Sequence, residues 1–187
     1  MTRGMIAGEG HTARSLSELL SDGSITRSRQ GVYRLAELLP VGETAFAEAM
    51  LSIPHGIICL VSALAYYGLT TQIPAAVFVA VPRRLTPSRN SGDVPIVTVR
   101  MPGRLLSSGV NRVRTSVGQT FRIFTAERSV CDAFRYVRLA GEDVAFESLR
   151  RYLDRPKPNL AVLVEAAQFT GTYRTIAPAL QTFTATS

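Results

Sequence analysis

The longest uncharged stretch of the chain, residues 56–82, places the tightest limit on what this sequence can fold into. A helix that spans a bilayer needs about 20 continuous apolar residues. Four polar or turn-forming residues interrupt the stretch near its middle: Thr70, Thr71, Gln72 and Pro74. The pattern therefore predicts a buried helix over 62–67 that ends at Gly68, then a turn, then a buried strand over 76–81. No membrane span is expected.

The rest of the chain from residue 43 onward continues this mixture of helices and strands. Residues 57–60 either form a strand or begin the next helix, and further strands are predicted at 95–100, 110–115 and 121–124. Apolar residues at helical spacing predict helices at 43–51, 126–138, 142–153, 159–169 and 172–184. Because 46% of the 187 residues are hydrophobic, a sizeable core can form. The predicted fold class is α/β (α+β), with a mixed-sheet domain over 44–187 and a C-terminal helical cluster.

The first 38 residues are predicted to form a smaller unit. Residues 1–11 lack apolar periodicity and are expected to be a disordered tail. A helix is predicted over 12–22, followed by a hairpin with strands at 24–27 and 32–35. One helix and one hairpin bury too little surface to be stable alone, so the unit over 12–38 must pack against something else.

The positive charge of the chain is concentrated in its middle. The formal net charge is +7, and residues 83–138 hold eleven arginines against three acids, whereas the segments on either side are close to neutral. Arginine presents a planar fork that suits phosphate and carboxylate groups. The segment therefore predicts either an anionic partner or a basic surface that only aids solubility.

The residues needed for common enzyme chemistry are scarce. The sequence has no Gly-rich phosphate loop, and its only histidines, His11 and His55, are poorly placed for a catalytic triad. The single lysine, Lys157, lies between two prolines. The two cysteines, Cys59 and Cys131, lie in apolar runs with no zinc-site spacing. We expect no catalytic residue, no cofactor and no metal, and a cytoplasmic protein with reduced, buried thiols.

Several short blocks resemble the AbiEi-type antitoxins in their order and spacing. The first block is Leu16-x-x-Leu-x-x-x-Gly23 with Ile25, Arg27 and Gly31-Val-Tyr-Arg34. The second block is Leu60-Val-Ser-Ala-Leu64, Tyr67-Gly-Leu-Thr70, Pro74 and Val79-Ala-Val-Pro-Arg83. The third block is Glu127-Arg-Ser-Val-Cys-Asp132 with Arg135, which is similar to the family's ERTxxD helix. Together the blocks cover roughly residues 12–155.

This resemblance implies a type IV toxin–antitoxin, or abortive-infection, system. In that family an N-terminal winged helix-turn-helix binds operator repeats and represses the operon. The C-terminal domain counters a nucleotidyltransferase-like toxin encoded beside it. Residues 12–38 resemble only the recognition helix and the wing. About ten residues precede them, too few for two supporting helices, so we expect sequence-specific DNA binding to be weak.

The candidate DNA-binding side chains lie in this partial winged helix-turn-helix. On the helix over 12–22 they lie opposite Leu16 and Leu20, and on the hairpin they would contact phosphate, which positions a protein without specifying sequence. The predicted set is Thr12, Arg14, Ser15, Arg27, Arg29, Gln30 and Arg34. The same residues could instead form the outer face of an amphipathic helix and a solvated turn.

The candidate partner-binding residues lie in two places. Arg83 and Arg84 fall in an exposed Pro-rich loop. Arg128, Asp132 and Arg135 are spaced i, i+4 and i+7, so they share one helix face. That face predicts either a polar patch that binds the toxin or an ion-pair ladder that holds the helix to a neighbour.

Three functions from different classes remain open at this point. The first is an antitoxin that neutralises a separately encoded toxin and possibly represses its own operon, by a mechanism that need not involve direct contact. The alternative is a nucleic-acid-binding accessory protein or transcriptional regulator without a toxin partner. The third, an enzyme that acts on nucleic acid, is disfavoured by the residue inventory above.

Overall fold

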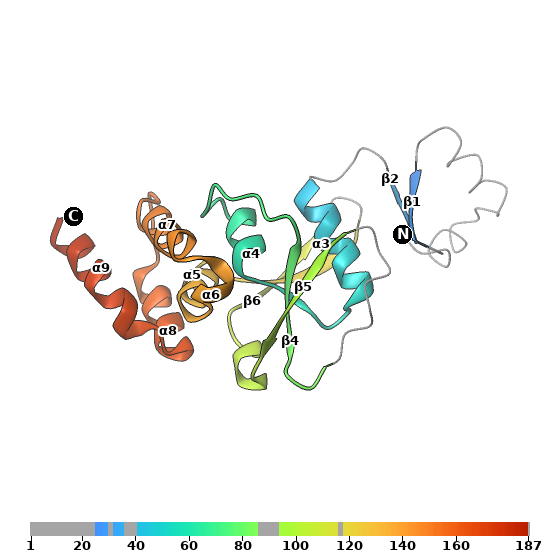
Figure 1. The fold of residues 1–187 in the computed structure, drawn as a ribbon. Helices are drawn as coiled ribbons and strands as arrows, with labels where there is room; N and C mark the ends of the chain where they lie inside the picture. The colour runs from blue at the N-terminus through green and yellow to red at the C-terminus, as the bar shows by residue number, and fades with distance from the viewer. Residues whose placement is uncertain (1–24, 30–31, 36–40, 86–93, 116–117, 187) are drawn as a thin grey trace.

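The computed structural model describes residues 25–29, 32–35, 41–85, 94–115 and 118–186 (Figure 1). Within these ranges the chain forms a short hairpin, a five-stranded mixed sheet and a C-terminal cluster of helices. The predicted α/β class, with its mixed sheet and its helical cluster, is confirmed.

The N-terminal hairpin consists of β1 (Ile25–Arg29) and β2 (Val32–Leu35), which pair antiparallel as predicted. β1 ends two residues later than expected. The tail predicted over 1–11 and the helix predicted over 12–22 lie outside the described residues.

The five-stranded sheet has the strand order β5–β4–β3–β7–β6. Its strands are β3 (Ile57–Ile58), β4 (Val77–Pro82), β5 (Ile96–Met101), β6 (Val110–Arg114) and β7 (Thr120–Phe124). The β4–β5 and β3–β7 pairs are parallel, and the β3–β4 and β6–β7 pairs are antiparallel. The short β3 joins the two halves of the sheet, and Ile58 opposite Ile123 is its register pair with β7.

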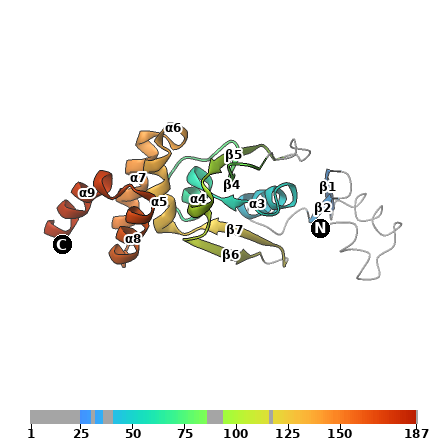
Figure 2. The ribbon, with the colours of Figure 1, turned by 90° about the horizontal axis from the view of Figure 1, so that it is seen from below.

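The two faces of the sheet are covered by different elements. α3 (Val41–Ser52) packs Phe46 and Met50 against one face, together with Ile53 just after the helix, and Figure 2 shows this helix beside the strands. The opposite face is covered by the 3₁₀ turn η1 (Gly103–Leu106), where the chain crosses from β5 to β6. Both faces of the central strands are therefore buried, which agrees with their uncharged sequence.

The uncharged stretch forms α4 (Leu60–Tyr66) and then β4, in the predicted order of helix, turn and strand. The helix begins at Leu60, two residues before the predicted start, and Val61 and Leu64 face the core. Among the described helices, none combines the length and the apolar character that crossing a membrane requires.

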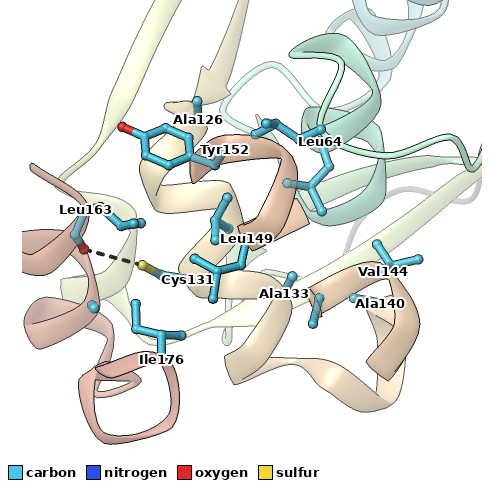
Figure 3. Close-up of a cluster of buried hydrophobic side chains, with 14 of the residues drawn as sticks. Leu64, Ala126, Cys131, Ala133, Ala140, Val144, Leu149, Tyr152, Leu163 and Ile176 are labelled. Atoms are coloured by element: carbon cyan, nitrogen blue, oxygen red, sulfur yellow. Dashed lines mark hydrogen bonds between the residues drawn. The ribbon is translucent and has the colours of Figure 1, made fainter. Parts of the chain in front are cut away.

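The C-terminal cluster is built around α5, which contacts α4, α7 and α8. Its helices are α5 (Ala126–Arg135), α6 (Val137–Ala140), α7 (Glu142–Leu153), α8 (Leu160–Thr170) and α9 (Tyr173–Thr186). Figure 3 shows Cys131 of α5 among Leu149, Leu163 and Ile176. One buried residue from each of α7, α8 and α9 therefore lies near Cys131.

The single helix predicted over 126–138 is in fact two helices. The backbone leaves the helical region at Tyr136, with φ −113° and ψ 39°, so that α5 ends and α6 begins there. α6 ends at Gly141, whose φ of +94° is one that residues with a Cβ rarely adopt. A Cβ at that position would also lie 2.6 Å from an Asp143 carboxylate oxygen.

Candidate anion-binding surface

The polar face of α5 is buried, and Arg128 and Asp132 form an ion pair inside the protein. Their side chains are 1% and 0% exposed, and Arg128 Nε lies 2.9 Å from Asp132 Oδ2. Arg128 Nη2 donates to the Leu105 carbonyl at 2.8 Å and Nη1 donates to the Ser108 carbonyl at 3.1 Å. Two of the guanidinium nitrogens therefore hold the β5–β6 connection against α5, and the third pairs with Asp132 on the same helix.

The carboxyl group of Asp132 is desolvated, and this changes its pKa. Burial raises the pKa of the Asp132 carboxyl to about 6, although the adjacent Arg128 guanidinium opposes that rise. Asp132 Oδ1 accepts no hydrogen bond from the described residues. The aromatic ring of Phe124 closes the site on another side, 4.5 Å from the centre of the guanidinium group.

The expectation that Arg128 and Asp132 bind a partner is therefore corrected. Helical spacing placed them on one face, and that face is covered by η1 and by the core instead of being open to solvent. The other expectation, an ion-pair ladder that holds the helix to a neighbour, is met only in part: Arg128 holds the neighbouring turn through backbone carbonyls, whereas its ion pair with Asp132 lies within α5. Arg135, the third member, is exposed, and its guanidinium donates to the Thr170 carbonyl at the end of α8.

Both cysteine thiols are free and buried, as predicted. Burial raises the pKa of each thiol above its ordinary value. A thiol that is both inaccessible and protonated is a poor nucleophile and a poor metal ligand, so Cys59 and Cys131 serve the core.

The arginines that remain available lie mainly on β5, β6, β7 and the adjoining turns. Residues 94–126 contain five arginines and no acidic residue. Arg112 and Arg114 of β6 are exposed, and Arg122 of β7 is half-buried. Among the described residues, the ion pairs are Arg128–Asp132, Arg150–Asp154 and Arg151–Glu147, so none of these three arginines has a carboxylate partner there.

The register of β6 and β7 brings two positive charges face to face. Arg112 lies directly opposite Arg122, and Arg114 lies opposite Thr120. Since side chains alternate along a strand, these four residues share the sheet face opposite α3. Cross-strand like charges lower the stability of a sheet, so this arrangement carries a cost that the fold itself does not need.

A second group of arginines surrounds the end of β4. Arg83 and Arg84 are exposed, as predicted, and the Arg83 backbone N–H donates to the Met101 carbonyl at 3.2 Å. That bond places them beside the end of β5, where Arg100 and Arg104 are also exposed. Sequence reasoning identified Arg83 and Arg84 as candidates, but it singled out none of the arginines of β5, β6 and β7 within the basic segment over 83–138.

The predicted DNA-binding residues are only partly described. Arg27 and Arg29 lie on β1 and Arg34 lies on β2, with Arg27 opposite Tyr33. The other predicted DNA contacts lie outside the described residues: Thr12, Arg14, Ser15 and Gln30.

A polar cavity of about 700 Å³ lies beside α7 and the turn that follows α4. Glu147 closes one side of it by accepting hydrogen bonds from Thr70 and Thr71, and it also pairs with Arg151. Arg155 donates to the Tyr67 carbonyl at 2.8 Å. These contacts fasten the turn to α7, so Glu147 and Arg155 act as structural links.

No protein-family model matches the chain, and no curated protein is significantly similar to it. In the described part of the chain, no three histidine, cysteine, aspartate or glutamate side chains come together in a way that could hold a metal ion. The candidate site is therefore defined by its geometry and charge: two groups of exposed arginines on the sheet and its turns.

Proposed function

We propose that this chain is a regulatory binding protein of the AbiEi antitoxin type, which acts in the cytoplasm on a nucleotidyltransferase-like toxin and contributes to repression of the shared operon. It acts by binding, with no catalytic step of its own. The hairpin β1–β2 would supply phosphate contacts to the operator, and the α/β domain would neutralise the toxin.

The observation that carries this proposal is the way the resembling blocks assemble. The blocks at 60–70, 79–83 and 127–132 become α4, β4 and α5, and α4 contacts both of the others. Val61, Leu64 and Leu69 pack in one cluster with Val130 and its neighbours on α5. Blocks that define a family through its fold should meet in space in this way, which supports the resemblance.

The exposed arginines around the end of β4 are the best candidates for the toxin-binding surface. Arg83, Arg84, Arg100 and Arg104 present four guanidinium groups with no ion-pair partner among the described residues. Such a surface favours fast association with an acidic protein and disfavours association with basic ones.

The second candidate function is that of a nucleic-acid-binding regulator without a toxin partner. The acid-free segment over 94–126 favours it, because an arginine-only surface also suits a phosphate backbone. A neighbouring gene for a toxin that the chain can counteract would distinguish the first candidate function from the second.

Co-expression with the nucleotidyltransferase-like toxin encoded beside the chain tests the proposal. We expect the full chain to restore growth, and R83Q/R84Q to reduce this protection without changing the thermal unfolding of the protein. K157Q/R174Q, which removes two exposed charges from the C-terminal region, is the matched control and should protect fully. If no such gene neighbours the chain, or if the full chain gives no protection, the antitoxin assignment fails.

A further inference from the structure

β6 and β7 form a two-stranded ribbon with a closed turn at its end. The Thr115 N–H donates to the Gln119 carbonyl at 2.8 Å, and the Thr115 hydroxyl accepts from the Gln119 N–H at 3.1 Å. β6 is the edge strand of the sheet, and β7 anchors the ribbon through Phe121 and Ile123 in the core. The ribbon therefore presents its outer face from a rigid base, which lowers the entropic cost of binding a ligand.

The outer face of this ribbon carries three arginines and a threonine. Arg112 and Arg114 are two residues apart on one strand, so their Cβ atoms are about 6.7 Å apart. Arg122 lies directly across from Arg112, where cross-strand Cβ atoms are about 5 Å apart. Arg114 extends back over the turn, because a Cβ at Gly118 would lie 3.8 Å from its Nη2 atom.

The positive charges of these three arginines are not balanced by any carboxylate among the described residues. Arg122 Nη1 makes a long hydrogen bond of 3.4 Å to the His55 carbonyl, a neutral group. Arg112 and Arg114 make no ion pair within the described residues. Two opposed guanidinium groups without a carboxylate destabilise the sheet, so an anion bound between them would relieve their repulsion.

We propose that the β6–β7 ribbon is a nucleic-acid contact in its own right, in which Arg112, Arg114 and Arg122 bind the phosphate backbone of duplex DNA. This contact goes beyond the antitoxin proposal, which places the DNA contacts of the chain on β1–β2, and it gives the second candidate function a defined ligand and a defined set of residues. Thr120, exposed on the same face, adds a hydroxyl that can donate to a phosphate oxygen.

The residues on the ribbon face favour duplex DNA over other anionic ligands. Besides the arginines and Thr120 the face carries Val110, which is half-buried, and Phe124, which is completely buried. Single-stranded nucleic acid binds by stacking its bases on exposed aromatic rings, and protein interfaces centre on apolar or aromatic anchors. Neither feature is present on this face, whereas a β-ribbon has a width that fits the DNA major groove.

Charged residues on an edge strand have a second established use, since they keep two sheets from pairing edge to edge. Edge protection and a phosphate contact predict different results when the three charges are removed. Protection of the edge predicts self-association of the neutralised protein with unchanged DNA affinity, and the phosphate contact predicts weaker DNA binding by a protein that remains monodisperse.

The test measures binding of the full chain to a labelled DNA duplex of arbitrary sequence over a series of salt concentrations. R112Q/R114Q/R122Q is compared with R138Q/K157Q/R174Q, which removes three exposed charges from the C-terminal helices and the turns that join them. We expect the ribbon variant to bind about tenfold more weakly or worse. Its slope of log affinity against log salt should fall by about 2.7, the value for three lost phosphate contacts. R112K/R114K/R122K should retain the slope of the wild-type protein.

Three results would overturn the proposal. One is a ribbon variant whose affinity and salt slope equal those of the R138Q/K157Q/R174Q control. A second is self-association of the ribbon variant with unchanged DNA affinity, which would assign the arginines to edge protection. The third is loss of protection against the toxin with unchanged DNA affinity, which would assign the ribbon to an acidic protein surface. Circular dichroism is used to check that each variant is folded. The protection assay of the wild-type chain tests the antitoxin proposal, and its result does not depend on the DNA-binding result.

Discussion

Arginine has opposite environments in two neighbouring regions of this molecule. On α5, Arg128 is almost completely buried, paired with a carboxylate, and bonded to two backbone carbonyls. On the β6–β7 ribbon, Arg112 and Arg114 are exposed, unpaired within the described residues, and set near another positive charge. The two regions are adjacent, because Arg128 donates to the Ser108 carbonyl just before the ribbon, and a Cβ at Gly109 would lie 3.0 Å from Arg128 Cβ.

The comparison shows that the environment of an arginine decides its role. A buried guanidinium is tolerated only where its donors are satisfied and its charge is balanced, and it then works as a cross-link. An exposed guanidinium without a partner adds no stability to the fold and is free to bind a ligand. Changing one region while the other serves as its control separates these two roles.

The largest effect is expected from Arg128→Met. This substitution leaves the Asp132 carboxylate buried without its partner and frees the carbonyls of Leu105 and Ser108, so it should lower the free energy of unfolding by about 3–5 kcal/mol. Arg114→Met on the ribbon should change it by less than about 0.5 kcal/mol. Urea unfolding followed by circular dichroism measures both. Equal losses would show that the two regions do not differ.

The buried pair should also give the protein a characteristic pH dependence. Burial raises the pKa of Asp132 from 3.8 to about 6 in the folded protein, so the folded state binds the proton more tightly than the unfolded chain. The group therefore contributes most stability below about pH 4 and loses this contribution as the pH rises through about 6. The shift corresponds to about 3 kcal/mol.

R128M/D132L is the reference for this measurement, because it removes both charges and replaces them with apolar groups. Such replacements are often neutral in stability, so this variant should fold. Between pH 4 and pH 7, the unfolding free energy of the wild-type protein should fall relative to that of R128M/D132L as the pH rises. A constant difference would mean that Asp132 does not titrate in this range.

A smaller effect is expected where the two regions meet. Gly109 has a φ of +66°, and a Cβ there would lie 3.0 Å from Arg128 Cβ. Gly109→Ala should therefore destabilise the protein by about 1–3 kcal/mol, through the strained backbone and the crowded contact. Gly103→Ala is the matched control, since a Cβ at Gly103 has no neighbour within 4 Å. Thermal unfolding of the two variants should differ clearly, and similar curves would contradict this reading.

The smallest effect has the opposite sign. Arg112→Thr removes the repulsion with Arg122 and places a good strand former on β6, so it should raise the free energy of unfolding by about 0.5 kcal/mol. The gain should shrink in high salt, which screens the repulsion. Arg114→Thr, opposite the neutral Thr120, should show no salt-dependent gain. Chemical unfolding at low and high salt tests the pair of variants.

Most of the regular structure could be predicted because its signals are local. The uncharged stretch indicated α4 and β4, and helical spacing located α7, α8 and α9 to within two residues at each end. The 3₁₀ turn η1 could not be predicted in this way, because its place depends on hydrogen bonds from Arg128, about 20 residues further along the chain. The break at Tyr136 was missed for a similar reason, since the apolar spacing continues across it.

The candidate sites were harder to predict than the fold. Helical spacing correctly placed Arg128 and Asp132 on one face, but spacing alone cannot tell whether another element covers that face. The ribbon was missed although Arg112 and Arg114 alternate visibly in the sequence. Its defining feature, Arg122 opposite Arg112, depends on the register between two strands, and register is fixed by the turn and by packing.

The two-residue strand β3 has a consequence for how the protein is made. Its partner β4 follows it closely in the chain, but its other edge is paired only after Ile123 of β7 has been made, about 65 residues after Ile58. At a synthesis rate of about 5–20 residues per second, the ribosome needs roughly 3–13 s to cover that interval. During this time the half-sheet of the nascent chain has an open apolar edge. Slow translation of the codons between these two isoleucines should therefore increase misfolding, even though the finished protein would be unchanged.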